Sequence, residues 1–190
     1  MKNYPESFAK LIESLEKLPS IGRKSATRLA YFLAFEDKFS ALKIAHSIET
    51  CIQELRICEN CKGIANANLC EICQDDTRNN SELCIVANAR EIFLIEESGE
   101  FCGKYFVINS LDELDLKALQ ERISKENIKE IIFAFSPSLG SESIMLYLED
   151  KLSHLGLKFS KIAQGVPTGV SLENVDQLSI IRAIQSRIKI

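Results

Sequence analysis

Hydrophobic positions in the first part of the chain recur with the period of amphipathic helices. From Phe8 the apolar residues are spaced by three or four positions as far as Leu18, and Pro19-Ser20-Ile21-Gly22 then interrupts the pattern. The spacing resumes twice, first at Ala26, Leu29, Ala30 and Leu33, and then at Ala41, Ile44, Ala45, Ile48, Ile52 and Leu55. This part of the chain is therefore predicted to be all-helical, with a tight turn between its first two helices.

Beyond about residue 79 the pattern changes to short apolar runs that alternate with helical periods. The runs predict four strands, at Leu83–Val86, Tyr105–Ile108, Ile131–Phe135 and Leu157–Ile162. Helical spacing between them predicts three helices, at Ala89–Glu97, Leu114–Ser124 and Glu142–Leu155. Strands that alternate with helices in this way indicate βα units, and so a mostly parallel sheet covered by helices.

The change of pattern divides the chain into modules and predicts an α+β protein. We expect a helical hairpin domain at residues 1–56, a cysteine-rich finger at 57–78, a small α/β domain at 79–165 and a C-terminal segment at 166–190. The opening residues 1–6 lack the apolar core of a secretory signal, and the longest apolar run, Ile131–Phe135, is far too short to cross a bilayer. A cytoplasmic protein without membrane contact is therefore expected.

Charge is distributed unevenly over these modules. The formal net charge is −4, but residues 1–57 carry nine Lys or Arg against seven Asp or Glu, while residues 79–190 carry twelve against sixteen. Between Lys17 and Arg28 there are four basic residues and no acid. A local basic site on an acidic body favours DNA contact at one end and protein contact at the other. A merely solvated helix face is the alternative.

Four of the seven cysteines form two CxxC pairs, Cys58/Cys61 and Cys70/Cys73, with eight residues between the pairs. Two facing pairs can complete a tetrahedral shell of thiolates around zinc. The intervening segment is short and polar and cannot bury a core, which favours one structural Zn²⁺ per chain. A redox-active CxxC and an iron–sulfur cluster are the alternatives. Because cysteine fills all four positions, no coordination site is left open for catalysis.

The other three cysteines, Cys51, Cys84 and Cys102, lie within apolar patterns. In a chain without a secretory signal they are expected to be reduced thiols. We predict that all three are buried and serve in packing.

The segment Leu18–Ala26 joins two helices through a turn that contains Gly22 and looks like a helix–hairpin–helix DNA-binding motif. Backbone N–H groups at the start of the second helix attract a phosphate, and Arg23, Lys24 and Arg28 would add contacts from the same helix. Such contacts give sequence-independent, salt-sensitive binding. An ordinary helical hairpin is the alternative, and Ser20 stands where this motif usually has its first glycine.

Five stretches in this order resemble the RecR family of recombination mediators over essentially the whole chain. They are residues 18–30, the C-x2-C-x8-C-x2-C finger, and residues 84–108, 134–143 and 161–176. The resemblance implies a Toprim fold for the α/β domain and a non-enzymatic protein that forms a dimer or a tetrameric ring. It also implies a clamp on gapped or single-stranded DNA that acts with RecO and RecF to load RecA in DNA repair.

Toprim catalysis uses carboxylates to hold Mg²⁺ beside phosphate, with one Glu after the first strand and an acidic pair after the third. By the resemblance these positions fall at Ala87, Gly140 and Glu142, of which only Glu142 is acidic. The loop after the second strand is shortened to residues 109–112. We therefore expect no catalytic metal site in this domain, and we assign Glu142 on the acidic α/β surface to partner binding.

The tail resembles a Walker B-like segment of the family. It keeps Glu173 and Asp176 but has Ser171 where an acid is often found. No GxxxxGK[ST] sequence occurs in the chain, so an ATP site is not expected. We predict that the tail makes a subunit or partner contact.

Two functions of other classes remain open at this point. A Toprim-type magnesium-dependent nuclease or topoisomerase would need the acids that Ala87 and Gly140 replace. A zinc-stabilised protein adaptor without DNA contact would not need the basic hairpin. A hydrolase is not indicated, because neither His46 nor His154 has a recognisable nucleophile nearby in the sequence.

Overall fold

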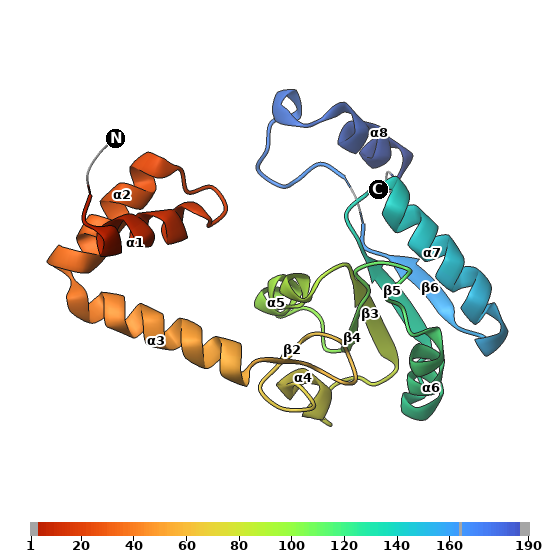
Figure 1. Cartoon of the computed structure of the whole chain (residues 1–190). Coiled ribbons are helices and arrows are strands. Elements are labelled where there is room, and N and C mark those ends of the chain that lie inside the picture. Colours follow the sequence, from red (N-terminus) through yellow and green to blue (C-terminus); the bar gives the residue numbers. More distant parts are fainter. Residues whose placement is uncertain (1–3, 164, 187–190) are drawn as a thin grey trace. The chain divides into compact units, whose positions relative to one another are not determined.

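The computed structural model describes residues 4–163 and 165–186, and it divides the chain into two compact units, Met1–Leu55 and Arg56–Ile190. The N-terminal unit is all-helical, as the hydrophobic spacing predicts (Figure 1). Its elements are α1 (Glu6–Glu16), α2 (Arg23–Tyr31), the π-helical turn η1 (Phe32–Glu36) and α3 (Lys38–Glu54).

A small core holds α1 against α2. Ile12 of α1 is fully buried with Ala26 and Ala30 of α2, and partly buried apolar residues, including Phe8 and Leu15, surround them. The two alanines lie one turn apart on the same face, so their small side chains let the helices approach closely. In contrast, no described residue of α3 is buried, although its sequence is strongly apolar on one side.

The second unit contains a parallel sheet of four strands in the order β4-β3-β5-β6. The strands are β3 (Glu82–Val86), β4 (Lys104–Val107), β5 (Glu130–Ala134) and β6 (Lys158–Lys161). The helices that connect them are α5 (Ala89–Ser98), α6 (Leu116–Glu126) and α7 (Leu139–Leu152). This confirms the predicted α/β arrangement, with α6 and α7 on one face of the sheet and α5 on the other (Figure 1).

Alternating residues of the strands supply the two cores. Leu83 and Ile85 of β3 face α6 and α7 with Phe106, whereas Cys84 and Val86 face α5 with Tyr105. Side chains alternate between the faces of a strand, and both faces of the sheet are covered over β3, β4 and β5, so these strands are apolar after their first residue, whereas the edge strand β6 is mostly polar. The side of the sheet that faces α6 and α7 holds the larger core.

The helix ends differ by a few residues from the predicted ones for local reasons. Helix α7 begins three residues earlier than expected, because the Ser138 side chain accepts a hydrogen bond from the Ser141 backbone N–H at 3.0 Å and caps it. Its last predicted turn is the separate 3-10 helix η2 (Ser153–Leu155).

The remaining elements are short. Antiparallel strands β1 (Arg56–Ile57) and β2 (Ile64–Ala65) and the helix α4 (Glu71–Gln74) form the cysteine-rich segment. The tail contains the 3-10 turn η3 (Leu172–Asn174) and α8 (Gln177–Gln185). Two-residue strands are too short to produce a periodic signal, which is why the sequence pattern missed them.

Burial of the non-clustered cysteines was predicted correctly only for Cys84, which is buried in β3. Cys51 and Cys102 are exposed, so the prediction was wrong for both. Cys51 lies on α3, none of whose residues is buried, and Cys102 lies in the loop before β4. Apolar neighbours in the sequence therefore did not show whether another element packs over these cysteines in the folded protein.

A candidate metal centre and a candidate DNA-binding hairpin

The four cysteines of the two CxxC pairs meet at one point. The sulfurs of Cys58, Cys61, Cys70 and Cys73 all lie within 4.8 Å of one another, and the Cys61 and Cys70 sulfurs are 3.6 Å apart. Four thiolates bound tetrahedrally to zinc at ~2.3 Å would be separated by about 3.8 Å. The donor set and its spacing therefore suit a single tetrahedral ion of the zinc type, as the sequence predicts.

The backbone around the cluster also suits thiolates. The Gly63 N–H donates to the Cys61 sulfur and the Cys70 N–H donates to the Cys58 sulfur, each at 3.3 Å. The turn that allows the first contact passes through Lys62, which has a left-handed φ of 61°. Hydrogen bonds among the clustered thiols lower the pKa of Cys70 but raise the pKa of Cys61. The two N–H···S hydrogen bonds favour thiolates, the form that a metal ion requires.

Lys104 ties the second cysteine pair to the sheet. It is the first residue of β4, its side chain is almost fully buried, and its Nζ donates to the carbonyl oxygens of Ile72 at 2.9 Å and Asp75 at 2.6 Å. These carbonyls lie in and just after α4, where cations are favoured by the helix dipole. The sequence analysis missed this residue, because a lysine that begins a strand resembles an ordinary surface charge.

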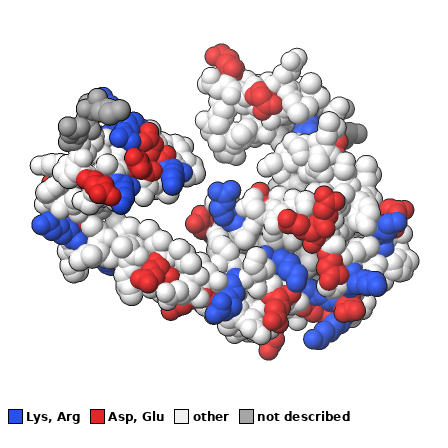
Figure 2. Space-filling view, viewed as in Figure 1, with Lys and Arg blue, Asp and Glu red and all other residues white. Residues whose placement is uncertain are grey.

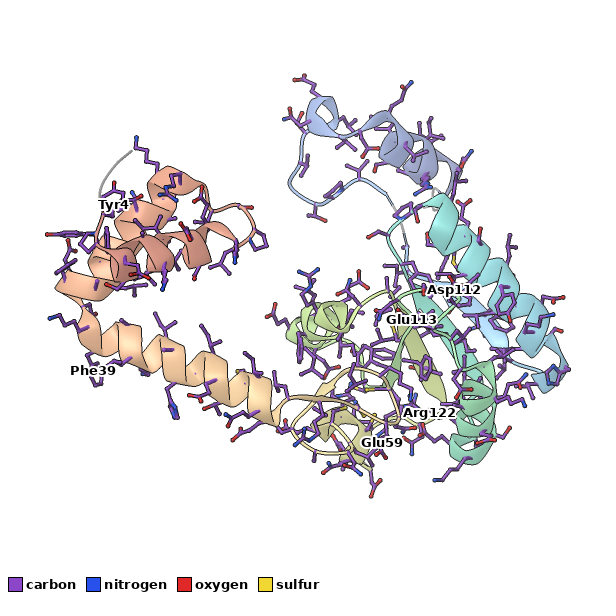
Figure 3. The ribbon with its side chains drawn as sticks, in the orientation of Figure 1. Tyr4, Phe39, Glu59, Asp112, Glu113 and Arg122 are labelled. Carbon is purple, nitrogen blue, oxygen red and sulfur yellow. The ribbon has the colours of Figure 1, made fainter. Side chains whose placement is uncertain are left out.

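Arg122 ties the first cysteine pair to the sheet in the same way. Its Nη1 donates to the carbonyl oxygens of Tyr105 at 2.7 Å and Asn60 at 3.1 Å, and its Nε donates to Glu126 at 3.1 Å. Figure 3 shows Arg122 beside the finger, with Glu59 labelled next to it. Helical spacing could have identified this arginine, because it falls on the buried face of α6 with Leu119 and Ile123.

The hairpin places Gly22, Arg23 and Lys24 at the start of α2, and Arg28 lies in its last turn. Gly22 is the residue before the helix and has no side chain with which to cap it, so the N–H groups of the first turn are left for an external acceptor. Ser20 has a φ of 63°. Ser20, which stands where the motif usually has a glycine, thus takes the left-handed backbone conformation that glycine adopts most readily.

The three predicted cations lie on one face of α2. Arg23, Lys24 and Arg28 are all exposed and line a cavity of about 1110 Å³ within the N-terminal unit. Arg23 also donates to Glu16 of α1 at 2.9 Å, a hydrogen bond that raises the pKa of Arg23. Figure 2 shows the resulting mixture, with basic and acidic side chains side by side over the α1–α2 hairpin.

The structure brings no carboxylate cluster together at the Toprim positions. Ala87 follows β3, and its N–H donates at 2.8 Å to Glu91, whose carboxylate is used in the capping box of α5. Gly140 and Glu142 lie in the first turn of α7. Among the residues that the structure describes, no group other than the four cysteines places three or more potential ligands close enough for a metal ion.

Glu142, predicted as a partner-binding residue, lies on a separate groove. The groove has a volume of about 470 Å³, and its lining includes the aromatic residues Phe133 and Phe159 and the charged residues Glu142, Glu149 and Lys161. In the tail, the Asp176 side chain accepts from the Ser179 N–H at 2.9 Å and so caps α8, which gives this acid a local structural role.

These features define a class of protein in which a helix–hairpin–helix unit precedes a four-cysteine metal site and a parallel α/β domain. The family model described as "RecR, helix-hairpin-helix" matches residues 8–52. The recombination proteins RecR of Helicobacter pylori strain P12 and of a Nitratiruptor species are 50% and 51% identical over 188 and 190 residues.

The alignments span 99% of this chain and 97% of the Helicobacter protein, and 100% of both chains for Nitratiruptor. Recombination protein RecR of Campylobacter jejuni strain 81-176 is 45% identical over 185 residues, 97% of each chain. The chain belongs to the RecR family of recombination proteins. Within the described ranges, no helix is both long and apolar enough to traverse a lipid bilayer.

Proposed function

We propose that the chain is a non-enzymatic recombination mediator that binds DNA through the α1–α2 hairpin. The observation that carries the proposal is the α2 helix itself, whose uncapped N-terminus and exposed Lys24 and Arg28 open onto one cavity. Membership of the RecR family supports the same function. A phosphate would accept from the N–H groups of Arg23 and Lys24 in the first turn, while the side chains of Lys24 and Arg28 neutralise neighbouring phosphates.

Salt-dependent binding tests this site. We expect the triple variant Arg23→Ala, Lys24→Ala, Arg28→Ala to bind a labelled gapped duplex more weakly in fluorescence anisotropy. The slope of log affinity against log salt should become shallower by about 0.9 for each phosphate of duplex DNA that the variant no longer neutralises.

A matched control removes three cations elsewhere in the same unit. Lys10 pairs with Glu6 on α1, while Lys38 and Lys43 lie on α3, and none of the three lines the α2 cavity. The variant Lys10→Ala, Lys38→Ala, Lys43→Ala changes the net charge equally. Equal reductions in affinity for the two triple variants would mean that the hairpin is not a specific site and would contradict the proposal.

The four-cysteine centre holds one structural Zn²⁺ in this proposal. Support comes from the all-sulfur donor set, the spacing of the sulfurs and the two N–H···S hydrogen bonds. Bound zinc would fix the two cysteine pairs to each other and, through Lys104 and Arg122, to the sheet. It leaves no open coordination position, so it supplies no catalysis.

Self-assembly into a dimer or a tetrameric clamp is part of the proposal. The exposed apolar side chains of α3, among them Ile44, Ile48 and Ile52, support it, since an unpartnered stripe of this kind is typical of an interface. Much of the α3 surface in Figure 2 is uncharged. Several weak phosphate sites on one assembly would add through effective concentration. The C-terminal segment is proposed as a further subunit contact.

RecO and RecF are the proposed protein partners in the bacterial cytoplasm, with RecA loading on gapped or single-stranded DNA as the outcome. The groove at Glu142 supports a contact with a partially basic, partially apolar surface, because two acids and two aromatic rings line it together. Glu142→Gln together with Glu149→Gln should weaken RecO binding in titration calorimetry. Glu121→Gln with Glu113→Gln, which removes two acids outside this groove, is the control.

The absence of enzymatic activity is also proposed. Support comes from the residues at the Toprim positions, since Ala87 and Gly140 offer no carboxylate and Glu91 is held in a capping box. Incubation of labelled DNA with pure protein and Mg²⁺ should leave the DNA intact. Cleavage that Glu142→Gln abolishes would instead establish a Toprim nuclease.

A further inference from the structure

The cavity beside the α2 cations has an aromatic wall that phosphate binding does not use. Besides Arg23, Lys24 and Arg28, it is lined by four aromatic residues, Tyr4, Phe8, Tyr31 and Phe32. Tyr31 and Phe32 are 53% and 42% exposed, although each presents a large apolar surface. Exposed aromatic rings that gather at one cavity form a contiguous apolar patch, and such patches are typical of interaction sites.

Helical spacing places the Tyr31 ring on the same face of α2 as two of the cations. Lys24, Arg28 and Tyr31 are separated by four and three residues, so all three project from one face of α2. Arg28 and Tyr31 are therefore neighbours about 5–6 Å apart at their Cβ atoms. A nucleotide with its phosphate at Arg28 could reach the Tyr31 ring with its base.

The ring is also held in place before any ligand arrives. Tyr31 packs against Phe35 with ring centroids 5.1 Å apart and an interplanar angle of 34°, and Phe35 packs against Phe8 at 6.1 Å. The backbone at this point is the π-helical turn η1, in which the Asp37 N–H donates to the Phe32 carbonyl at 2.9 Å. Short π-helical turns are rare and occur often at functional sites.

We propose that this aromatic wall is a stacking platform for an unpaired nucleobase, so that the hairpin recognises single-stranded DNA beside the phosphates that it binds. The inference rests on the proposed DNA-binding function and adds the side chains that would recognise an unpaired base. Aromatic rings stack on any base, so recognition of this kind is tolerant of sequence. A base within a duplex is already stacked and paired, and it cannot use the platform.

Charge favours nucleic acid over a second copy of this chain as the occupant. The cavity is lined by three cations and a single acid, Glu36. In a dimer whose two-fold axis passed through this cavity, the patch would meet itself and place these cations opposite one another. Phosphates supply the complementary charge, and their bases supply the complementary flat surface.

A double-mutant cycle between the protein and the DNA tests the platform. The protein is wild type or Tyr31→Ala, and the labelled single strand either carries its bases or is abasic over the binding site with its phosphates intact. Tyr31→Ala should weaken binding of the normal strand roughly fivefold to a hundredfold, as loss of one stacked base does. On the abasic strand the variant and the wild type should bind alike.

Three further measurements complete the test. Tyr31→Phe should restore affinity for the normal strand, because it keeps the ring. Phe93→Ala removes a ring that is 49% exposed on α5 and lies outside the cavity, so it should bind as the wild type does. A fully paired duplex should bind wild type and Tyr31→Ala equally.

The outcomes separate this inference from the proposed function. An equal effect of Tyr31→Ala on normal and abasic strands would overturn the platform while leaving phosphate binding intact. Unchanged binding of every DNA by the Arg23, Lys24, Arg28 triple variant would instead remove the hairpin site as a whole.

Discussion

At the scale of single residues, a partly buried ion pair fixes the segment that leads from the cysteine finger into β3. Arg78 donates to both carboxylate oxygens of Glu96, at 2.8 and 2.6 Å, and to the carbonyl oxygens of Gly103 and Phe101. Tyr105 donates to the same carboxylate. Burial raises the pKa of Glu96, but the hydrogen bonds from Arg78 and Tyr105 outweigh it and hold the pKa below its usual value.

This pair predicts a dependence of stability on pH. Because the pKa of Glu96 is depressed in the folded protein, its contribution is complete above about pH 4.3, the ordinary value for Glu, and is lost as the pH falls through the folded-state pKa. Glu96→Gln should lower the free energy of unfolding by about 2 kcal/mol at pH 7, since Arg78 loses its charged partner. The difference from wild type should disappear in acid.

Urea denaturation at a series of pH values measures this difference. Glu97→Gln, which neutralises the adjacent exposed acid, is the control and should unfold as the wild type does at every pH. A Glu96→Gln difference that persists undiminished in acid would show that packing, not charge, accounts for it.

At the scale of elements, two buried cations join the cysteine finger to the α/β domain. Lys104 from β4 binds the carbonyls at α4, and Arg122 from α6 binds the carbonyl of Asn60. The backbone adds a third link, since the Val107 N–H donates to the Cys61 carbonyl at 2.8 Å. The finger is therefore docked by groups that the sheet and α6 supply, besides its own cysteines.

Removing the Lys104 ammonium should undo part of this docking. Lys104→Met keeps the length of the side chain but leaves the Ile72 and Asp75 carbonyls without their donor, which should cost about 3 kcal/mol of stability. Zinc should also pass faster to a chromophoric chelator, because α4 is held less firmly around Cys70 and Cys73.

Lys158→Met is the matched control. Lys158 is likewise the first residue of a strand, but its side chain is 72% exposed and pairs with Glu130 at the surface. A surface pair of this kind contributes little, so stability and zinc release should stay close to wild type. Equal behaviour of the two methionine variants would show that Lys104 does not hold the finger.

At the scale of the whole molecule, the two units have separate cores. Ile12, Ala26 and Ala30 stabilise the N-terminal unit, whereas the finger and the sheet form the second unit. Loss of the metal ion should therefore affect the second unit first. Since a metal site of this kind contributes directly to folding, the finger should unfold when its ion is removed.

Cys58→Ser tests this expectation against Cys102→Ser. Cys58 is a buried member of the four-cysteine cluster, while Cys102 is an exposed thiol outside it. Cys58→Ser should lose the bound zinc, measured by elemental analysis, and hydrogen exchange should rise around residues 57–78 but not in α1 and α2. Cys102→Ser should keep one zinc per chain. A Cys58→Ser protein that is folded and holds a full equivalent of zinc would refute the ligand set.

The sequence by itself determined the local elements and the chemical groups of both sites. Hydrophobic periodicity set the helices of the N-terminal unit and the βα order of the second, because each amphipathic element must bury one face. The spacing of Cys58, Cys61, Cys70 and Cys73 specified a tetrathiolate centre, and the order of Gly22 before three cations specified the hairpin. These are short-range properties, in which the interacting groups are close along the chain.

Only the tertiary structure determined which side chains are buried and which lie together when the residues involved are far apart in the sequence. Lys104 and Arg122 became buried supports of the finger because packing brought β4 and α6 against it, whereas sequence alone cannot tell a buried cation from a solvated one. Cys51 and Cys102 lie in apolar sequence but are exposed, since no described element of their own unit covers them. The aromatic wall at Tyr31 likewise depends on the close packing of α1, α2 and η1, which places rings from separate elements around a single cavity.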